Sequence, residues 1–229
     1  MNLRELLKDI PCEIYSADGE KIRQGSELEN IFLDRKIRDI TNDSRKAGEG
    51  MLFFAIRGAN SDGHDYAPQV AANGAAAILS EHPLKLALDG QDVTKLPAVV
   101  CVNSTRRGMA FVSAAFYGHP SRRMKMIGIT GTKGKTTTTY LVRSILEKAG
   151  IDMGLIGTIE SAWHEVHRPS NNTTPESIDL QRGPGPGGRR RAGGCHGGVL
   201  AGTEAGPHGR NSVRHRRVYQ PLGGPHRAE

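Results

Sequence analysis

Apolar positions in the first half of the chain fall into short runs that alternate with amphipathic stretches. The runs have the length of strands, and they lie at residues 51–56, 75–79 and 98–102. Helical spacing follows the first run over residues 66–72, where Asp65 is positioned to cap a helix and Asn73-Gly74 to stop it. Helical spacing also follows the third run, after Ser104. This alternation predicts an α/β unit, and the breakers at residues 118–121 predict its end.

The second half opens with a strand, a glycine-rich turn and a helix. The apolar run at residues 124–129 predicts a buried strand, and the turn that follows reads Gly131-Thr132-Lys133-Gly134-Lys135-Thr136. The helix after it has a predicted apolar face of Leu141, Val142, Ile145, Leu146 and Ala149. Glycines let successive backbone N–H groups point inward, and the positive end of the helix dipole faces an anion. The segment therefore predicts a phosphate-binding loop, in which Lys135 reaches the β- and γ-phosphates and Thr136 ligates Mg²⁺.

Two features qualify this interpretation. A Gly-Lys-Thr triplet also occurs by chance in an ordinary strand–helix turn, and the usual pattern has a glycine where this chain has Ile129. The flanking strand and amphipathic helix favour the phosphate loop. Beyond it, a strand is predicted over residues 154–159 and a short helix over residues 177–181.

Charge and cysteine usage narrow the class of protein. The net charge of +7 resides in residues 182–229, which hold nine Arg, no Lys, no Asp and two Glu, so a nucleic-acid-binding role would rest on this tail alone. No run of about 18 apolar residues predicts a membrane span. The first residues mix charges and predict a short helix capped by Asn2, not a secretion signal. Cys12, Cys101 and Cys195 lack metal-ligand spacing, and their odd number fits a reducing cytoplasm.

Two small polar clusters in the first unit have both a functional and a structural interpretation. Asp43-Ser44-Arg45 offers a hydroxyl and a guanidinium to a phosphate or sugar, but it also fits an ordinary polar turn. Asp62-Gly63-His64-Asp65 offers metal ligands, although a capping role for Asp65 and a structural role for a lone histidine account for it equally well.

Three motifs in order resemble the Mur ligase family, and in particular its members that add a diamino acid. The stretch ITGTKGKTT resembles the ATP-binding loop of these ligases, including the departure at Ile129. Upstream, DSRKAGEGMLFFAIRGANSDGHDY resembles their uridine-nucleotide-binding domain, and NNTTPESIDLQ resembles a substrate-binding segment. Three motifs in the family order over residues 1–182 are more specific than the loop alone.

The resemblance implies an N-terminal α/β domain for the UDP moiety over residues 1–120 and the start of a P-loop ATPase domain over residues 121–182. It implies a cytoplasmic, ATP- and Mg²⁺-dependent ligase that joins meso-diaminopimelate or lysine to UDP-MurNAc-L-Ala-D-Glu through an acyl phosphate. Residues implied to bind ATP are Gly131, Thr132, Lys133, Gly134, Lys135, Thr136 and Thr137, with Lys135 catalytic and Thr136 on the metal. Residues implied to bind the substrate are Ser44, Ala59, Asn60, Ser61, Asn172, Thr173 and Thr174.

The resemblance stops after Gln181. Residues 183–229 include 13 Gly and 5 Pro without helical or strand periodicity, which predicts a disordered tail. The tail is alternatively a frame-shifted translation, because the codons of residues 196–202, read one nucleotide later, can encode Met-Glu-Val-Ser-Ser-Gln-Ala, a segment that the family resemblance leads us to expect there. A chain that ends this way lacks the parts of the family that bind the diamino acid, and we expect no ligase turnover from it.

Three other interpretations remain open. A folylpolyglutamate synthetase has the same form of phosphate loop, but we do not expect it to carry the upstream motif. A nucleotide- or RNA-binding module would use the basic tail, and its binding would fall with salt. A product that never folds stably would show no cooperative unfolding.

Overall fold

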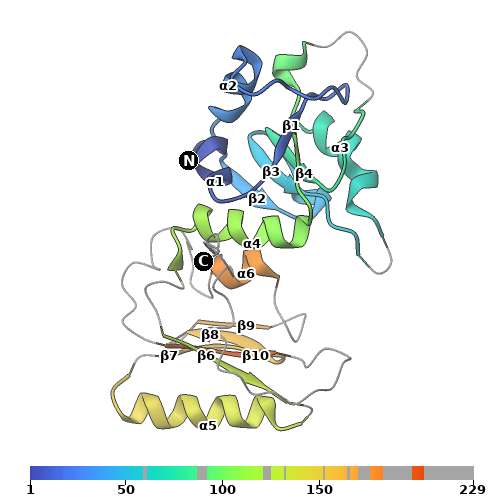
Figure 1. Ribbon diagram of the computed structural model, residues 1–229. Helices are drawn as coiled ribbons and strands as arrows, with labels where there is room; N and C mark the ends of the chain where they lie inside the picture. The colour runs from blue at the N-terminus through green and yellow to red at the C-terminus, as the bar shows by residue number, and fades with distance from the viewer. Residues whose placement is uncertain are drawn as a thin grey trace, which may run out of the picture. The chain divides into compact units, whose positions relative to one another are not determined.

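The computed structural model describes residues 1–58, 61–86, 92–120, 125–131, 133–151, 153–163, 166–169, 176–182 and 198–203. The chain divides into two compact units, Met1–Phe116 and Tyr117–Glu229, which are shown in Figure 1. Each unit is built around its own five-stranded sheet. Ala59, Asn60, Thr132, Asn172, Thr173 and Thr174, all predicted site residues, lie outside the described residues.

The first unit contains a mostly parallel sheet with the strand order β1-β5-β4-β3-β2. Its strands are β1 (Glu13–Tyr15), β2 (Asp39–Thr41), β3 (Met51–Phe54), β4 (Ala77–Ser80) and β5 (Ala98–Cys101). Strands β2 to β5 pair in parallel, and β1 runs antiparallel to β5. The three strands predicted from apolar runs are confirmed as β3, β4 and β5. Their apolar residues are continuous because parallel strands are buried on both faces.

Local capping fixes the helices of the first unit, which are α1 (Leu3–Leu7), α2 (Glu27–Leu33), α3 (Ala67–Ala72) and α4 (Thr105–Phe116). Asn2 caps α1 as predicted, since its Oδ1 accepts from Glu5 N at 2.9 Å while Glu5 Oε2 accepts from Asn2 N at 2.9 Å. Ser104 Oγ accepts from Arg107 N at 3.4 Å at the start of α4. The predicted stop after α3 is also confirmed, because Gly74 adopts a φ of +81°.

The cap predicted at Asp65 is wrong. A 3₁₀ turn, η2 (Gly63–Tyr66), precedes α3, and Asp62 caps this turn by accepting from His64 N at 3.0 Å. Helix α3 itself begins after Tyr66 without a side-chain cap. The 3₁₀ turn begins at Gly63, before the first residue of the predicted helix. The carboxylate that caps this turn is therefore that of Asp62.

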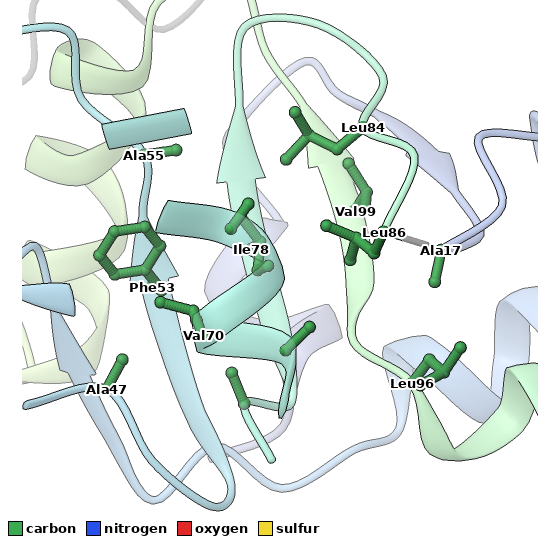
Figure 2. Packing of buried hydrophobic residues seen from close by; sticks show 13 residues of the cluster. Ala17, Ala47, Phe53, Ala55, Val70, Ile78, Leu84, Leu86, Leu96 and Val99 are labelled. Atoms are coloured by element: carbon green, nitrogen blue, oxygen red, sulfur yellow. The ribbon is translucent and has the colours of Figure 1, made fainter. Parts of the chain in front are cut away.

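The core of the first unit is packed on both faces of the sheet. Phe53, Ile78 and Val99 lie side by side in register on β3, β4 and β5, and Val70 of α3 covers them (Figure 2). On the opposite face α4 approaches β4 closely, because a Cβ on Gly108 would lie 2.6 Å from Leu79 Cδ2.

The second unit has a sheet of the order β6-β10-β7-β8-β9. Its elements are β6 (Lys125–Thr130), α5 (Lys135–Lys148), β7 (Met153–Ile156), β8 (Glu160–Trp163), β9 (Val166–Pro169), α6 (Ser177–Arg182) and β10 (Gly198–Thr203). Strands β6, β10 and β7 are parallel, whereas β8 and β9 continue the sheet antiparallel from β7. Helix α5 runs along one face of this sheet (Figure 1). The predicted strand, turn, helix and strand around residue 131 are confirmed, as is the predicted helix at α6.

Two predictions for the second unit need correction. The apolar face predicted on α5 is only partly buried, because Leu141 is 59% and Ile145 66% exposed. The prediction of a tail without regular structure is wrong for Gly198–Thr203, which forms β10 between β6 and β7. A strand with partners on both sides is held by backbone pairing, so it needs no alternation of apolar and polar residues.

Candidate nucleotide-binding site

The candidate site is centred on the turn between β6 and α5. Gly134 is the N-cap of α5 and lies in the left-handed region, with φ +78° and ψ −2°, where side chains other than glycine are strained. The first helical hydrogen bond runs from Thr138 N to Gly134 O at 2.9 Å. The N–H groups of the first turn therefore point out of the helix end, and no side chain caps them. This is the geometry that the sequence predicted for a phosphate cradle.

Lys135 folds back over the loop. Its Nζ donates to the carbonyl oxygen of Gly131 at 2.7 Å, so the ammonium group lies across the mouth of the turn. Thr139, one helical turn later, anchors the start of α5 by donating from Oγ1 to Lys135 O at 2.8 Å. Lys133 and Thr137 are exposed, while Thr136 is half-buried beside Lys135. The structure thus brings the described members of the predicted ATP-binding set to one end of α5.

A pocket extends from the loop along α5. Lys135, Thr136, Thr139 and Tyr140 line it from the helix, and residues of the 155–159 segment line it from β7 and the turn that follows. Among its lining residues, Leu155 is buried and apolar, and Thr136 is half-buried and carries a hydroxyl. A lining of both polar and apolar side chains suits a ligand with a charged end and an apolar body.

A hydrogen-bonded trio that includes Tyr140 of the pocket lining was not predicted from the sequence. Glu160 of β8 accepts from the Tyr140 hydroxyl at 2.7 Å through Oε1 and lies 2.7 Å from His167 Nδ1 through Oε2. The hydrogen bonds from His167 and then Tyr140 lower the pKa of Glu160, so this group is a carboxylate. Burial, and then the hydrogen bond to Glu160, raises the pKa of Tyr140. The trio ties α5 to the β8–β9 hairpin. Helical spacing places Tyr140 outside the predicted apolar face, and no motif marks it, so it could not be identified from the sequence.

In the first unit, Ser44 opens the 3₁₀ turn η1 (Ser44–Lys46). The preceding Asp43 binds Arg45 through two hydrogen bonds of 2.8 and 2.9 Å, and this pairing lowers the pKa of Asp43 to about 2. The guanidinium suggested as a phosphate ligand is therefore paired within its own turn. Ser61 is exposed, and its carbonyl oxygen accepts from Gly58 N at 2.9 Å. The described substrate-binding candidates Ser44 and Ser61 thus belong to two polar turns of one unit.

The second polar cluster holds its loop together. Asp62 accepts from His64 N and lies 2.5 Å from His64 Nδ1, and Arg57 Nε donates to its other oxygen at 2.9 Å. The hydrogen bonds from His64 keep the pKa of Asp62 well below its usual range. His64 Nε2 accepts from Glu81 N at 3.3 Å. Both ring nitrogens of His64 are occupied, so the metal interpretation has no support. Within the described ranges, no group of three or more His, Cys, Asp or Glu side chains is arranged to hold a metal ion.

Comparison with known proteins decides the family. A family model described as "Mur ligase family, catalytic domain" matches residues 36–117, and one described as "Mur ligase middle domain" matches residues 129–183. The chain belongs to the Mur ligase family. The middle-domain match contains the whole loop from Gly131 to Thr137.

Curated relatives are similar over the same part of the chain. The UDP-N-acetylmuramoyl-L-alanyl-D-glutamate–2,6-diaminopimelate ligase of Geobacillus thermodenitrificans is 46% identical over 182 residues, which is 80% of this Mur ligase chain and 32% of the relative. The ligase of the same name from Halalkalibacterium halodurans is 46% identical over 146 residues, 64% of this chain and 28% of the relative. The chain spans about a third of the length of the curated relatives it matches.

Solved structures show the same fold. A structure of a UDP-N-acetylmuramoyl-L-alanyl-D-glutamate–2,6-diaminopimelate ligase matches with a TM-score of 0.59 at 19% identity, covering 90% of this chain and 36% of the other. MurF from Acinetobacter baumannii matches with a TM-score of 0.53 at 23% identity, covering 89% of this chain and 36% of the other. Across the part of the chain that is described, no helix is long and apolar enough to cross a bilayer.

Proposed function

We propose that this chain is the N-terminal part of an ATP-dependent amide ligase of peptidoglycan-precursor synthesis. The ligase would add a diamino acid, meso-diaminopimelate or lysine, to UDP-MurNAc-L-Ala-D-Glu in the cytoplasm. The observation that carries the proposal is the loop at Gly134–Lys135, which has the geometry of a phosphate cradle and lies inside the middle-domain match. The names of the relatives supply the choice of substrate.

The described residues fit the phosphates of ATP. The positive φ of Gly134 turns the chain so that the first N–H groups of α5 are directed to an anion at the helix end. Among the described residues, the Gly131 carbonyl oxygen is the hydrogen-bond partner that Lys135 Nζ would exchange for a phosphate oxygen. ATP would supply the γ-phosphoryl group that activates the substrate carboxylate, and the amine of the diamino acid would then displace phosphate from the acyl phosphate.

Mg²⁺ would depend on few protein ligands. Thr136 is half-buried and lines the pocket, and its hydroxyl is the group we assign to the metal. Since Mg²⁺ binds through one or two protein groups together with substrate phosphates, a single hydroxyl suffices when ATP is present. The role of Lys135 would be to offset negative charge on the phosphoryl group during its transfer.

We assign the UDP end of the substrate to the first unit, with Ser44 and the Ala59-Asn60-Ser61 loop as its ligands, and the sugar–peptide end to Asn172, Thr173 and Thr174. The family match at residues 36–117 supports the first assignment. The chain spans about a third of the length of these relatives, and the activity we propose to test on it is the binding of nucleotide.

Titration of the purified chain with ATP and Mg²⁺ tests the proposal. We expect saturable binding that Lys135→Ala weakens at least tenfold, because the substitution removes the ammonium group at the mouth of the loop. Lys148→Ala, in the last turn of the same helix, is the matched control and should bind ATP as the parent does. Equal binding by the parent and Lys135→Ala would contradict the assignment of this loop.

Two further measurements separate the alternatives. UDP-MurNAc-L-Ala-D-Glu should raise the unfolding midpoint of the chain if the first unit binds it, because a ligand stabilises only the folded state that holds it. Salt-dependent RNA binding that disappears when residues 183–229 are deleted, together with no response to either nucleotide, would favour the RNA-binding module instead.

A further inference from the structure

The loop between β7 and β8 forms one wall of the candidate nucleotide pocket. Gly157, Thr158 and Ile159 line the pocket on this side. Gly157 N donates to Glu160 O at 3.0 Å, in continuation of the pairing between β7 and β8. Thr158 and Ile159 lie between these two ends, and both are exposed, Ile159 by 62%. This wall therefore presents a hydroxyl and an apolar side chain that a ligand in the pocket can contact.

The residues of this loop do not fix its conformation by themselves. A hairpin with two residues between its strands is usually closed by glycine or asparagine in the left-handed region. Thr158 and Ile159 are β-branched instead, and neither adopts a positive φ. The exposure of Ile159 also means that little packing surrounds its side chain. The position of the loop must therefore be fixed by contacts with neighbouring elements.

The side chain of Glu160, at the end of the loop, makes such contacts. Its Oε1 accepts from the Tyr140 hydroxyl of α5 at 2.7 Å, and its Oε2 lies 2.7 Å from His167 Nδ1 of β9. The Glu160 side chain is only 20% exposed, and hydrogen bonds to a carboxylate are stronger than those between neutral groups. Tyr140 lies four residues after Thr136, so the two share one flank of α5. Glu160 therefore ties the loop to the flank of the helix that carries the proposed Mg²⁺ ligand.

We propose that Glu160 is a positioning residue of the nucleotide site. Its carboxylate holds the loop of Thr158 and Ile159 against α5 without contacting the nucleotide itself. On the opposite wall of the pocket lie Lys135 and Thr136. In this position Thr158 offers its hydroxyl to a phosphate oxygen, and Ile159 offers apolar surface to the body of the ligand. The inference rests on the proposed binding of ATP at the phosphate loop, to which it adds a second wall.

Titration of the full chain and its variants with ATP and Mg²⁺ tests this role. Glu160→Ala removes both contacts of the carboxylate and should weaken ATP binding by about fivefold or more. Adding Tyr140→Phe to this variant should weaken binding no further, because both changes remove the same contact. Glu160→Gln keeps a carbonyl oxygen for the Tyr140 hydroxyl and should bind within about twofold of the parent. Glu147→Ala is the matched control and should bind as the parent does, since it removes a carboxylate that pairs with Arg143 at 2.7 Å on the same helix, outside the pocket lining.

Hydrogen exchange of the Gly157 amide, measured without nucleotide, reports on the loop itself. Exchange should be faster in Glu160→Ala than in the parent and unchanged in Glu160→Gln. A role of Glu160 limited to fold stability would lower the unfolding midpoint but leave the ATP affinity unchanged, because nearly all molecules stay folded well below that midpoint. Thermal unfolding of each variant gives the midpoint.

Three results overturn the inference. The first is ATP binding by Glu160→Ala that equals binding by the parent. The second is an equal loss in Glu160→Gln and Glu160→Ala, which would assign the effect to charge. The third is unchanged exchange of the Gly157 amide in Glu160→Ala, with or without ATP binding. A parent chain that does not bind ATP contradicts the proposed function as well, whereas a parent that binds ATP no better than Glu160→Ala contradicts only the role of Glu160.

Discussion

Gly63 is the position in the first unit where an added methyl group should be least tolerated. A Cβ at Gly63 would lie 2.6 Å from Ile56 N, 2.8 Å from Ile56 O and 3.1 Å from Ala55 C. All three are backbone atoms of the two residues that follow β3, and carbon contacts are favourable only at about 3.5 Å or more. Gly63→Ala must therefore move one backbone segment by roughly 0.5–1 Å. The movement also lengthens the hydrogen bond from Gly63 N to Ile56 O, now 2.9 Å.

The expected cost follows from these contacts. Overpacking costs about 1–3 kcal/mol, and a lost backbone hydrogen bond adds about 1 kcal/mol, so Gly63→Ala should lower the free energy of unfolding by about 2–4 kcal/mol. For a unit of this size the unfolding midpoint should fall by roughly 8–16 °C, at about 4 °C per kcal/mol. Urea and thermal unfolding of the full chain measure both quantities. Gly48→Ala is the matched control, since nothing lies within 4 Å of a Cβ there. Equal midpoints for the two variants would refute the argument from close backbone approach.

The remaining predictions concern titration, the pocket wall and the cysteines. The lowered pKa of Asp62 stabilises the fold above the unfolded value of about 4, so stability should fall as pH drops below about 4, and Asp62→Asn should flatten that fall in urea unfolding measured from pH 5 to 2. Tyr140→Phe should destabilise the second unit by about 1 kcal/mol through loss of the hydrogen bond to Glu160, which hydrogen exchange of the α5 amides measures. Unchanged exchange in the variant would show that this hydrogen bond contributes nothing to stability. Burial raises the pKa of Cys12 and of Cys101 to about 11, so both thiols should react with iodoacetamide at pH 8 far more slowly than a small thiol, as followed by site-resolved mass spectrometry.

The parts of the fold that the sequence predicted are those where burial is local and strong. Strands β3, β4 and β5 are apolar on both faces, so each is a continuous run that needs no long-range information to detect. The loop at Gly134 was predictable for another reason, since the left-handed turn restricts the residue type at that position.

Predictions failed where several residues could fill the same role and only the three-dimensional fold decides which of them does. Asp62 and Asp65 both precede α3, and only the three-dimensional turn decides that Asp62 is the cap. The trio of Tyr140, Glu160 and His167 joins three elements that are separated in the chain, and none of its members belongs to a recognisable motif. Such networks follow from strand order, which local periodicity does not encode.

Strand β10 shows how far composition misleads when a strand lies between partners. Its sequence, Gly-Val-Leu-Ala-Gly-Thr, occurs in a segment whose glycine and arginine content predicted disorder. It pairs with β6 over six residues and with β7 over four, and these bonds involve only the backbone.

Codons for residues 196–202 read in the next frame can encode Met-Glu-Val-Ser-Ser-Gln-Ala, and the frame shift remains a prediction. A strand position tolerates either sequence, because small and β-branched residues both pair in a sheet. Pairing in this sheet is therefore no evidence for the frame as written. Resequencing the coding DNA across codons 178–230 decides it, and a single-base change that opens the other frame would make the tail an artefact, whereas an unchanged frame would make β10 part of the native sheet.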